Sequence, residues 1–145
     1  MKLITLSNRK GQNGLAVGMD ANSFKVMFNN IITLPVNAQV ALVGFRIVPT
    51  DPPDADHRVY VHLTNLPIKS AMGNQYNGNV ATTTLGGFNT KEENCVHNPI
   101  FLDLDNVEPI NLSFIDVLLT NDVGKPTIDV DDLVILDIIY RKKPE

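Results

Sequence analysis

Cysteine and histidine are the residue types in this sequence best suited to nucleophilic or transition-metal chemistry. Cys95 and His97 lie two residues apart, but a thiol activated by an imidazole needs a geometry that neighbours on one loop rarely supply. His57 and His62 differ in parity along a predicted strand, so their side chains are expected on opposite faces rather than around one metal ion. We expect no catalytic site here, and we expect His62 to be an exposed strand residue.

Aspartates are the other candidate ligands, and they are concentrated between residues 103 and 137, where Lys125 is the only base. Carboxylate oxygens are the ligands that Ca²⁺ prefers, but none of these aspartates follows the spacing of a calcium-binding loop. Asp is also a common turn residue, so solvated turns and strand ends explain the pattern. We therefore predict no metal and no cofactor, although Ca²⁺ binding by an aspartate cluster stays open. The clustered residues are Asp103, Asp105, Asp129, Asp131 and Asp132.

Length and composition indicate one globular domain over residues 1–145. The chain is 43% hydrophobic with a formal net charge of −4, which gives no electrostatic case for binding nucleic acid. Trp is absent, which argues against a sugar-stacking platform. Cys95 is the only cysteine, so the chain cannot form an internal disulfide, and no apolar run approaches the ~20 residues of a membrane span. The apolar start is too short for a signal peptide, and we expect a soluble protein made inside the cell.

The elements that must position these residues are strands. Period-2 alternation and clusters of Gly, Pro, Asn and Asp recur along the chain, and no stretch has a sustained helical period. These patterns predict an all-β protein, and among eight-stranded folds a single jelly-roll β-sandwich of about eight antiparallel strands. The predicted strands cover residues 2–6, 23–28, 38–48, 58–63, 79–85, 99–104, 109–120 and 133–140. Residues 7–22 are expected to form a loop or arm after the first strand, 86–98 a loop, and 141–145 a basic tail.

The last two runs predict a long antiparallel pair that closes the sandwich, because residues 121–126 between them are rich in turn residues. Val134, Leu136, Ile138 and Tyr140 share one parity and are expected in the core. Other apolar side chains fall off the expected core parity, which favours contact with a neighbouring subunit. The predicted interface residues are Val40, Leu42, Leu112, Phe114 and Leu118.

Basic residues near the two ends form a second predicted surface. They are expected at solvated segments that contact an anion or pack against a neighbouring subunit. These residues are Arg9, Lys10, Arg141, Lys142 and Lys143.

Several short sequence segments together resemble the penton family. Its members are the small single jelly-roll proteins at the vertices of icosahedral viruses built from double jelly-roll major capsid proteins. The nearest likeness is to pentons of virophages and polinton-like viruses. It covers most of the chain from Phe24 onward and is carried by residues 24–28, 32–35, 39–45, 59–70, 110–124 and 133–139. The resemblance implies a structural protein of the virion that is made in the host cytoplasm or nucleus. It also implies a homopentamer at the five-fold axis, with the major capsid protein as partner. This chain has room only for the jelly roll, without an outward domain.

Two other functions compete with this one. A carbohydrate- or receptor-binding β-sandwich needs an aromatic patch or a loop metal site, for which Tyr60, Tyr76, Phe88 and the aspartates are available. An enzyme on a jelly-roll scaffold, such as a cupin, needs clustered histidine and carboxylate ligands. Three scattered histidines do not readily supply them, so we expect the protein not to be an enzyme.

Overall fold

The structure of the chain is a computed structural model. It describes residues 2–8, 15–48, 57–68, 79–85, 91–94, 99–120 and 133–145. For residues 15–20, 57–58, 79–85 and 91–94 it describes the backbone alone. The predicted strands at 38–48, 79–85 and 109–120 fall within this part of the chain.

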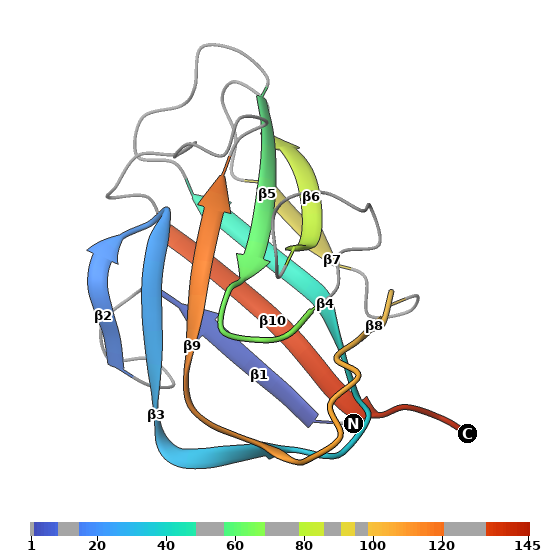
Figure 1. Cartoon of the computed structure of the whole chain (residues 1–145). Helices are drawn as coiled ribbons and strands as arrows, with labels where there is room; N and C mark the ends of the chain where they lie inside the picture. Colours follow the sequence, from blue (N-terminus) through green and yellow to red (C-terminus); the bar gives the residue numbers. More distant parts are fainter. Residues whose placement is uncertain are drawn as a thin grey trace.

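The described residues form ten strands in two five-stranded antiparallel sheets, and they contain no helix. Sheet A has the order β1 (Lys2–Ser7), β10 (Leu133–Lys142), β4 (Ala38–Val48) and β7 (Lys91–Asn94), and β8 (Leu102–Asp103) also pairs with β4. Sheet B has the order β2 (Leu15–Asp20), β3 (Ser23–Leu34), β9 (Ile110–Thr120), β5 (His57–Leu63) and β6 (Asn79–Leu85). Figure 1 shows sheet B in front of sheet A, with the strands of the two sheets crossing. The all-β sandwich prediction is confirmed.

The hydrophobic core lies between the two sheets. Alternate side chains of each central strand point inward, as the period of 2 requires. Val134, Leu136, Ile138 and Tyr140 of β10 are all buried in this core, as their shared parity predicts. Burial of each such aliphatic side chain contributes about 1.5–3 kcal/mol relative to exposure. The inward residues of sheet B include Val26, Val59, Val61, Leu63, Ile115, Val117 and Leu119.

A β-bulge in β4 reverses which side chains face the core. Asp137 of β10 pairs with Gly44, but the next residue, Ile138, pairs with Leu42. Val43 is therefore an extra residue without a partner on β10, and such a residue shifts the alternation by one.

The bulge explains why two predicted interface residues lie in the core. On one side of it Phe45 and Ile47 point inward, and on the other side Val40 and Leu42 do. The sequence parity put Val40 and Leu42 on the outer face, which is wrong because it assumed an uninterrupted period. Ala41 is buried as well, but it is not part of the core cluster.

A second irregularity accounts for Leu112. Met27 of β3 pairs with Phe114 of β9, but the next pair is Ile32 with Leu112, so β3 has extra residues here. Along β9, Leu112 and Ile115 are both buried in the core although they are three residues apart. The alternation of inward and outward side chains is therefore interrupted between them. Leu112 was predicted at a subunit interface, and the structure places it inside the subunit.

The predicted antiparallel pair of the last two long strands is also wrong. β9 pairs with β3 and β5 in sheet B, while β10 pairs with β1 and β4 in sheet A. Each strand is central in its own sheet and has an apolar inward face. The long apolar runs therefore indicate two strands that face each other across the core rather than one hairpin.

Two strands fall where loops were expected. β2 lies inside residues 7–22 and pairs with β3, and β7 lies inside residues 86–98 and pairs with β4. Both are at sheet edges, where a strand can be stabilised by one neighbour without a strong apolar alternation. The expected strand at 99–104 is reduced to β8, and β10 continues to Lys142, so Arg141 and Lys142 belong to a strand rather than to a tail.

Candidate functional site

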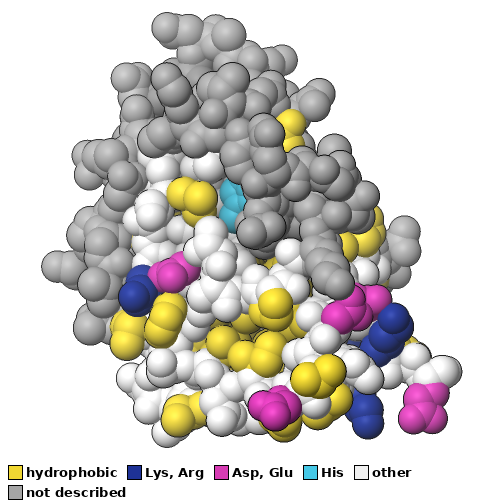
Figure 2. All heavy atoms as spheres, in the orientation of Figure 1, with side chains coloured by type: hydrophobic (Ala, Val, Ile, Leu, Met, Phe, Trp, Pro, Cys, Tyr) yellow, Lys and Arg dark blue, Asp and Glu magenta, His cyan; other side chains and the backbone are white. Residues whose placement is uncertain are grey.

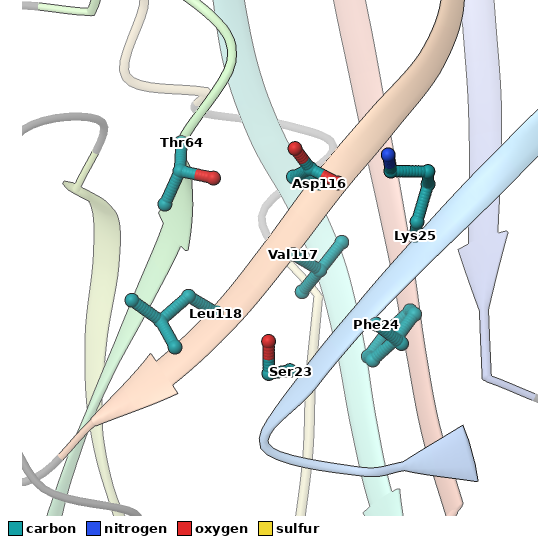
Figure 3. Close-up of a pocket in the computed structure, with 7 residues that line it drawn as sticks. All are labelled: Ser23, Phe24, Lys25, Thr64, Asp116, Val117 and Leu118. Atoms are coloured by element: carbon teal, nitrogen blue, oxygen red, sulfur yellow. The ribbon is translucent and has the colours of Figure 1, made fainter. Parts of the chain in front are cut away.

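A groove of about 410 Å³ lies on the outer face of sheet B. Three cross-strand pairs of β3 and β9 form it, together with Thr64 just after β5. Phe24 and Val117, whose side chains are buried in the core, line its middle, with Lys25 and Asp116 at one end and Ser23 and Leu118 at the other (Figure 3). The complete lining is Ser23, Phe24, Lys25, Thr64, Asp116, Val117 and Leu118.

The turn after β5 is fixed to the groove by an asparagine. Thr64 N–H donates to the Asp116 carbonyl at 3.1 Å, which extends the β5–β9 ladder by one residue. Beyond this point the Asn65 side chain forms the next hydrogen bonds to β9. Its Oδ1 accepts from Asp116 N–H at 2.9 Å, and its Nδ2 donates to the Phe114 carbonyl at 2.9 Å. The amide thus replaces the next residue of the strand, so the backbone groups of β9 remain paired where β5 turns away.

Lys25 lies next to two side chains of β9, those of Asp116 and Phe114. It lies opposite Asp116 in the register, and its Nζ is 4.3 Å from the centroid of the Phe114 ring. A cation over an aromatic face at an exposed site is worth about 0.5–1 kcal/mol. This end of the groove therefore presents one cation and one anion beside a half-buried ring.

Of the predicted interface residues, only two lie on this face. Both are partly exposed, on either side of Asp116: Leu118 lines the groove, and Phe114 lies next to it. Figure 2, which views this face, shows hydrophobic side chains gathered over its lower half, and Lys or Arg beside Asp or Glu at two places.

The prediction for His62 is wrong, because this side chain is 1% exposed. Its Nε2 lies 3.0 Å from Thr120 Oγ1, and Thr120 is buried too. The pairing of the imidazole with a hydroxyl makes a structural role the natural one for this residue.

Several exposed or half-exposed apolar residues were not identified by the sequence reasoning. On the outer face of sheet A, Leu3 is 63% exposed, and Ile139 opposite it and Ile135 are partly exposed. Parity along β10 was the signal that could have found the two isoleucines, since they alternate with the core residues. Within the described part of the chain the other exposed large hydrophobics are Ile31, Ile100 and Val107.

The predicted basic tail is bound to the body of the protein. The Arg141 guanidinium lies 3.5 Å from the centroid of the Phe101 ring, and its Nε donates to Gln39 Oε1 at 2.9 Å. Lys143 Nζ forms a salt bridge of 2.8 Å with Asp103 Oδ2, and Gln39 Nε2 donates to Asp103 Oδ1 at 2.7 Å. We call these residues the terminal clasp.

The terminal clasp shifts two ionisation equilibria. Hydrogen bonds from Lys143 and then from Gln39 lower the pKa of Asp103, and the same bond to Asp103 raises the pKa of Lys143. Both oxygens of Asp103 are engaged by these side chains, which argues against a Ca²⁺ ligand at this position. Lys142, between the two bound residues, is exposed.

A corner beside the terminal clasp is organised by Asn106. Its Nδ2 donates to the carbonyls of Pro35 and Glu108 at 2.7 and 2.8 Å, and its Oδ1 accepts from Ala38 N–H at 2.9 Å. Asn37 (φ 52°) and Asp105 (φ 51°) both adopt the left-handed conformation here. Asn and Asp tolerate that region better than other residues with a Cβ, so the local sequence is suited to the corner.

The structure does not describe the side chains of the remaining predicted residues. Cys95, His97, Arg9 and Lys10 are outside the described residues, as are the aspartates at 129, 131 and 132, and the side chain of His57 is not described. Within the described ranges no group of three or more His, Cys, Asp or Glu side chains could hold a metal ion.

Comparison with known proteins adds no family to this description. No family model matches the chain, and no curated protein matches it in sequence. Over the residues that the structure describes, no helix is long and apolar enough to cross a membrane.

Proposed function

We propose that this protein is a structural capsid protein of a virion. In this proposal it is the penton, which forms homopentamers at the five-fold vertices and contacts the major capsid protein. The resemblance of several of its sequence segments to those of pentons suggests this role. The observation that carries it furthest is the order of the strands.

The strand order supports the jelly-roll part of the proposal. With β2 and β8 set aside, eight strands remain, and we number them from one to eight along the chain. They lie in the order 1-8-3-6 in sheet A and 2-7-4-5 in sheet B. Two Greek keys wound in this way give the eight-stranded jelly roll that is common among viral capsid domains.

The outer face of sheet B supplies a surface for contact between copies. Phe114 and Leu118 are partly exposed there around an open groove. Aromatic and aliphatic side chains around a pocket are the usual centre of a protein interface. A ring of five subunits uses heterologous contacts, so this face would meet a different face of the next copy.

Substitution on this face tests the proposal. Phe114→Asp and Leu118→Asp are expected to fold but to fail to assemble, because each places a charge at the contact and leaves the core intact. Size-exclusion chromatography with light scattering measures the assembly, and circular dichroism measures the fold.

Val107→Asp is the matched control, since this residue is 85% exposed and lies away from the groove; it should assemble normally. Leu112→Asp should unfold the subunit instead, because Leu112 is in the core. An unaltered chain that stays monomeric and binds no capsid protein would refute the proposal.

A carbohydrate- or receptor-binding role is the second candidate, and the polar lining of the groove favours it. The hydroxyls of Ser23 and Thr64 and the carboxylate of Asp116 are hydrogen-bonding groups of the kind that bind sugar hydroxyls, with the Phe114 ring nearby. A glycan array with the unaltered chain and with Asp116→Asn tests this role. Binding that the substitution abolishes would support it, and the absence of binding to any glycan would count against it.

A further inference from the structure

We propose that the outer face of sheet A is the other half of the contact between copies, and that it docks on the groove face of sheet B in a second copy. Lys25 of one copy would then pair with Asp137 of the next, and Asp116 with Arg46. This inference rests on the proposed homo-oligomer and deepens it by naming the two faces.

The two faces have the same arrangement of apolar and acidic side chains. On β10, Ile135 and Ile139 lie two residues on either side of Asp137, and all three are partly exposed. On β9, Phe114 and Leu118 lie two residues on either side of Asp116 and are also partly exposed. Alternate residues of a strand are about 6.6–6.8 Å apart, so the two apolar rows have matching spacing.

Each face also carries one base beside its acid. On sheet B, Lys25 lies directly opposite Asp116 on the neighbouring strand. On sheet A, exposed Arg46 lies opposite Ile135, two residues along from Asp137.

Charge complementarity then selects the alignment of the two faces. If β10 lay directly over β9 of a second copy, Asp137 would meet Asp116 and the two carboxylates would repel each other. A displacement by one strand, about 4.8 Å, brings Asp137 to Lys25 instead. In that alignment the second base, Arg46, can reach Asp116, so each acid meets a base.

The carboxylate of Asp137 is oriented by a hydrogen bond within its own subunit. Thr5 Oγ1 of β1 donates to Asp137 Oδ1 at 2.6 Å, and Leu3 on the same edge is 63% exposed next to Ile139. The carboxylate is therefore oriented but keeps acceptor capacity for a cation. Exposed aliphatic side chains around an oriented charge give the mixed surface expected of a subunit contact.

Because the two faces differ, the contact is heterologous. Repetition of one heterologous contact closes into a ring if the rotation between copies closes, and otherwise produces a filament. The proposed pentamer requires the ring.

A charge exchange tests the pairing. Lys25→Glu, Asp137→Lys and the double variant are compared with the unaltered chain by size-exclusion chromatography with light scattering over a concentration series. Each single variant is expected to raise the concentration of half-assembly about tenfold or more, because like charges then face each other. The double variant restores opposite charges and should recover most of this shift.

A control variant separates the contact from the fold. Lys142→Glu reverses a charge at the end of β10, outside the two proposed pairs, and should assemble within about threefold of the unaltered chain. If Asp137→Lys does not fold, the second pair serves in its place, with Asp116→Lys and Arg46→Glu assembled alone and together.

The outcomes distinguish this inference from the proposed function. Single variants that assemble normally, or a folded double variant that recovers nothing, overturn the pairing and leave the capsid proposal standing. A folded, unaltered chain that is monomeric at every concentration and does not bind capsid protein overturns the capsid proposal, and the pairing with it.

Discussion

Single side chains, rather than long elements, hold the end of the sandwich where β1 begins and β10 ends. Asn106 connects the turn before β4 to the segment before β9, and the terminal clasp connects the end of β10 to β4 and β8. These contacts join residues that are far apart in the sequence, which is why the acidic and basic composition gave no sign of them.

Removal of the Asn106 side chain should destabilise the subunit. Asn106→Ala leaves Ala38 N–H and two carbonyls without this partner, and we expect a loss of about 1–3 kcal/mol in the free energy of unfolding. Urea denaturation followed by circular dichroism measures it. Asn111→Ala is the control, since Asn111 is exposed and bonds only with Thr33 among the side-chain contacts described; its effect should be within about 0.5 kcal/mol. Equal effects of the two would contradict the role given to Asn106.

The pKa of Asp103 should depend on Lys143. The folded-state pKa of this carboxyl is lowered, so the bond contributes stability above the unfolded pKa of about 3.9 and is lost as the pH falls through the folded value. For Lys143 the folded pKa is raised, so its contribution is present below about 10.4 and is lost as the pH rises through the folded value. The contact is exposed and its effect on stability is small.

Lys143→Met should therefore raise the pKa of Asp103 toward its ordinary value, which NMR titration of the carboxyl carbon measures. Lys142→Met should leave it unchanged, because Lys142 is the exposed neighbour. A pKa that responds equally to both variants would mean that general charge, not the hydrogen bond, causes the shift.

At the scale of elements, β10 is the strand whose two faces differ most clearly in role. Ile138 is 1% exposed in the core, and the next residue, Ile139, is partly exposed on the outer face of sheet A. Substitution of the two neighbours by alanine should therefore have different consequences.

Ile138→Ala should reduce the free energy of unfolding by about 2–5 kcal/mol, because it leaves a cavity in the core. Ile139→Ala should cost much less stability and weaken assembly instead. Denaturant unfolding and light scattering on the same samples separate the two effects. A stability loss for Ile139→Ala as large as that for Ile138→Ala would place both residues in the core.

Strand positions could be predicted from the sequence where alternation is uninterrupted. Residues 38–48 and 79–85 form strands over the predicted ranges, and the core face of β10 follows its parity. Alternation does not specify partners, however, so β9 and β10 were paired with each other although they lie in different sheets. Edge strands such as β2 and β7 depend on one neighbour and have little pattern of their own.

The candidate site could be predicted only in part. Phe114 and Leu118 were identified from parity and do lie on an outer face. Val40, Leu42 and Leu112 were misplaced, because irregular pairing in β4 and in the β3–β9 pair changes the parity and leaves no clear mark in the sequence. Asn65, which fixes the turn beside the groove, looked like an ordinary turn residue.

At the scale of the whole molecule, the two proposed faces lie on opposite sides of one sandwich. Assembly through them would couple folding to association, since a subunit held by two neighbours has less surface exposed to water.

The midpoint of thermal unfolding should therefore rise with protein concentration for the unaltered chain. For Phe114→Asp, which we expect to be monomeric, the midpoint should not depend on concentration. Differential scanning calorimetry over a hundredfold range of concentration measures both. A concentration-independent midpoint for an unaltered chain that light scattering shows to be assembled would mean that the oligomer adds nothing to subunit stability.

Val43 has a consequence for how insertions and deletions act on this fold. The extra residue leaves Leu42 and Gly44 opposite consecutive residues of β10, so deletion of Val43 would join them into a regular strand with Val40 and Leu42 still facing the core. A related sequence without this residue would show plain alternation along the whole strand and would need a gap at position 43 to align with this one. A one-residue insertion or deletion elsewhere in β4, without a bulge to absorb it, would instead exchange the inward and outward positions on one side of the change.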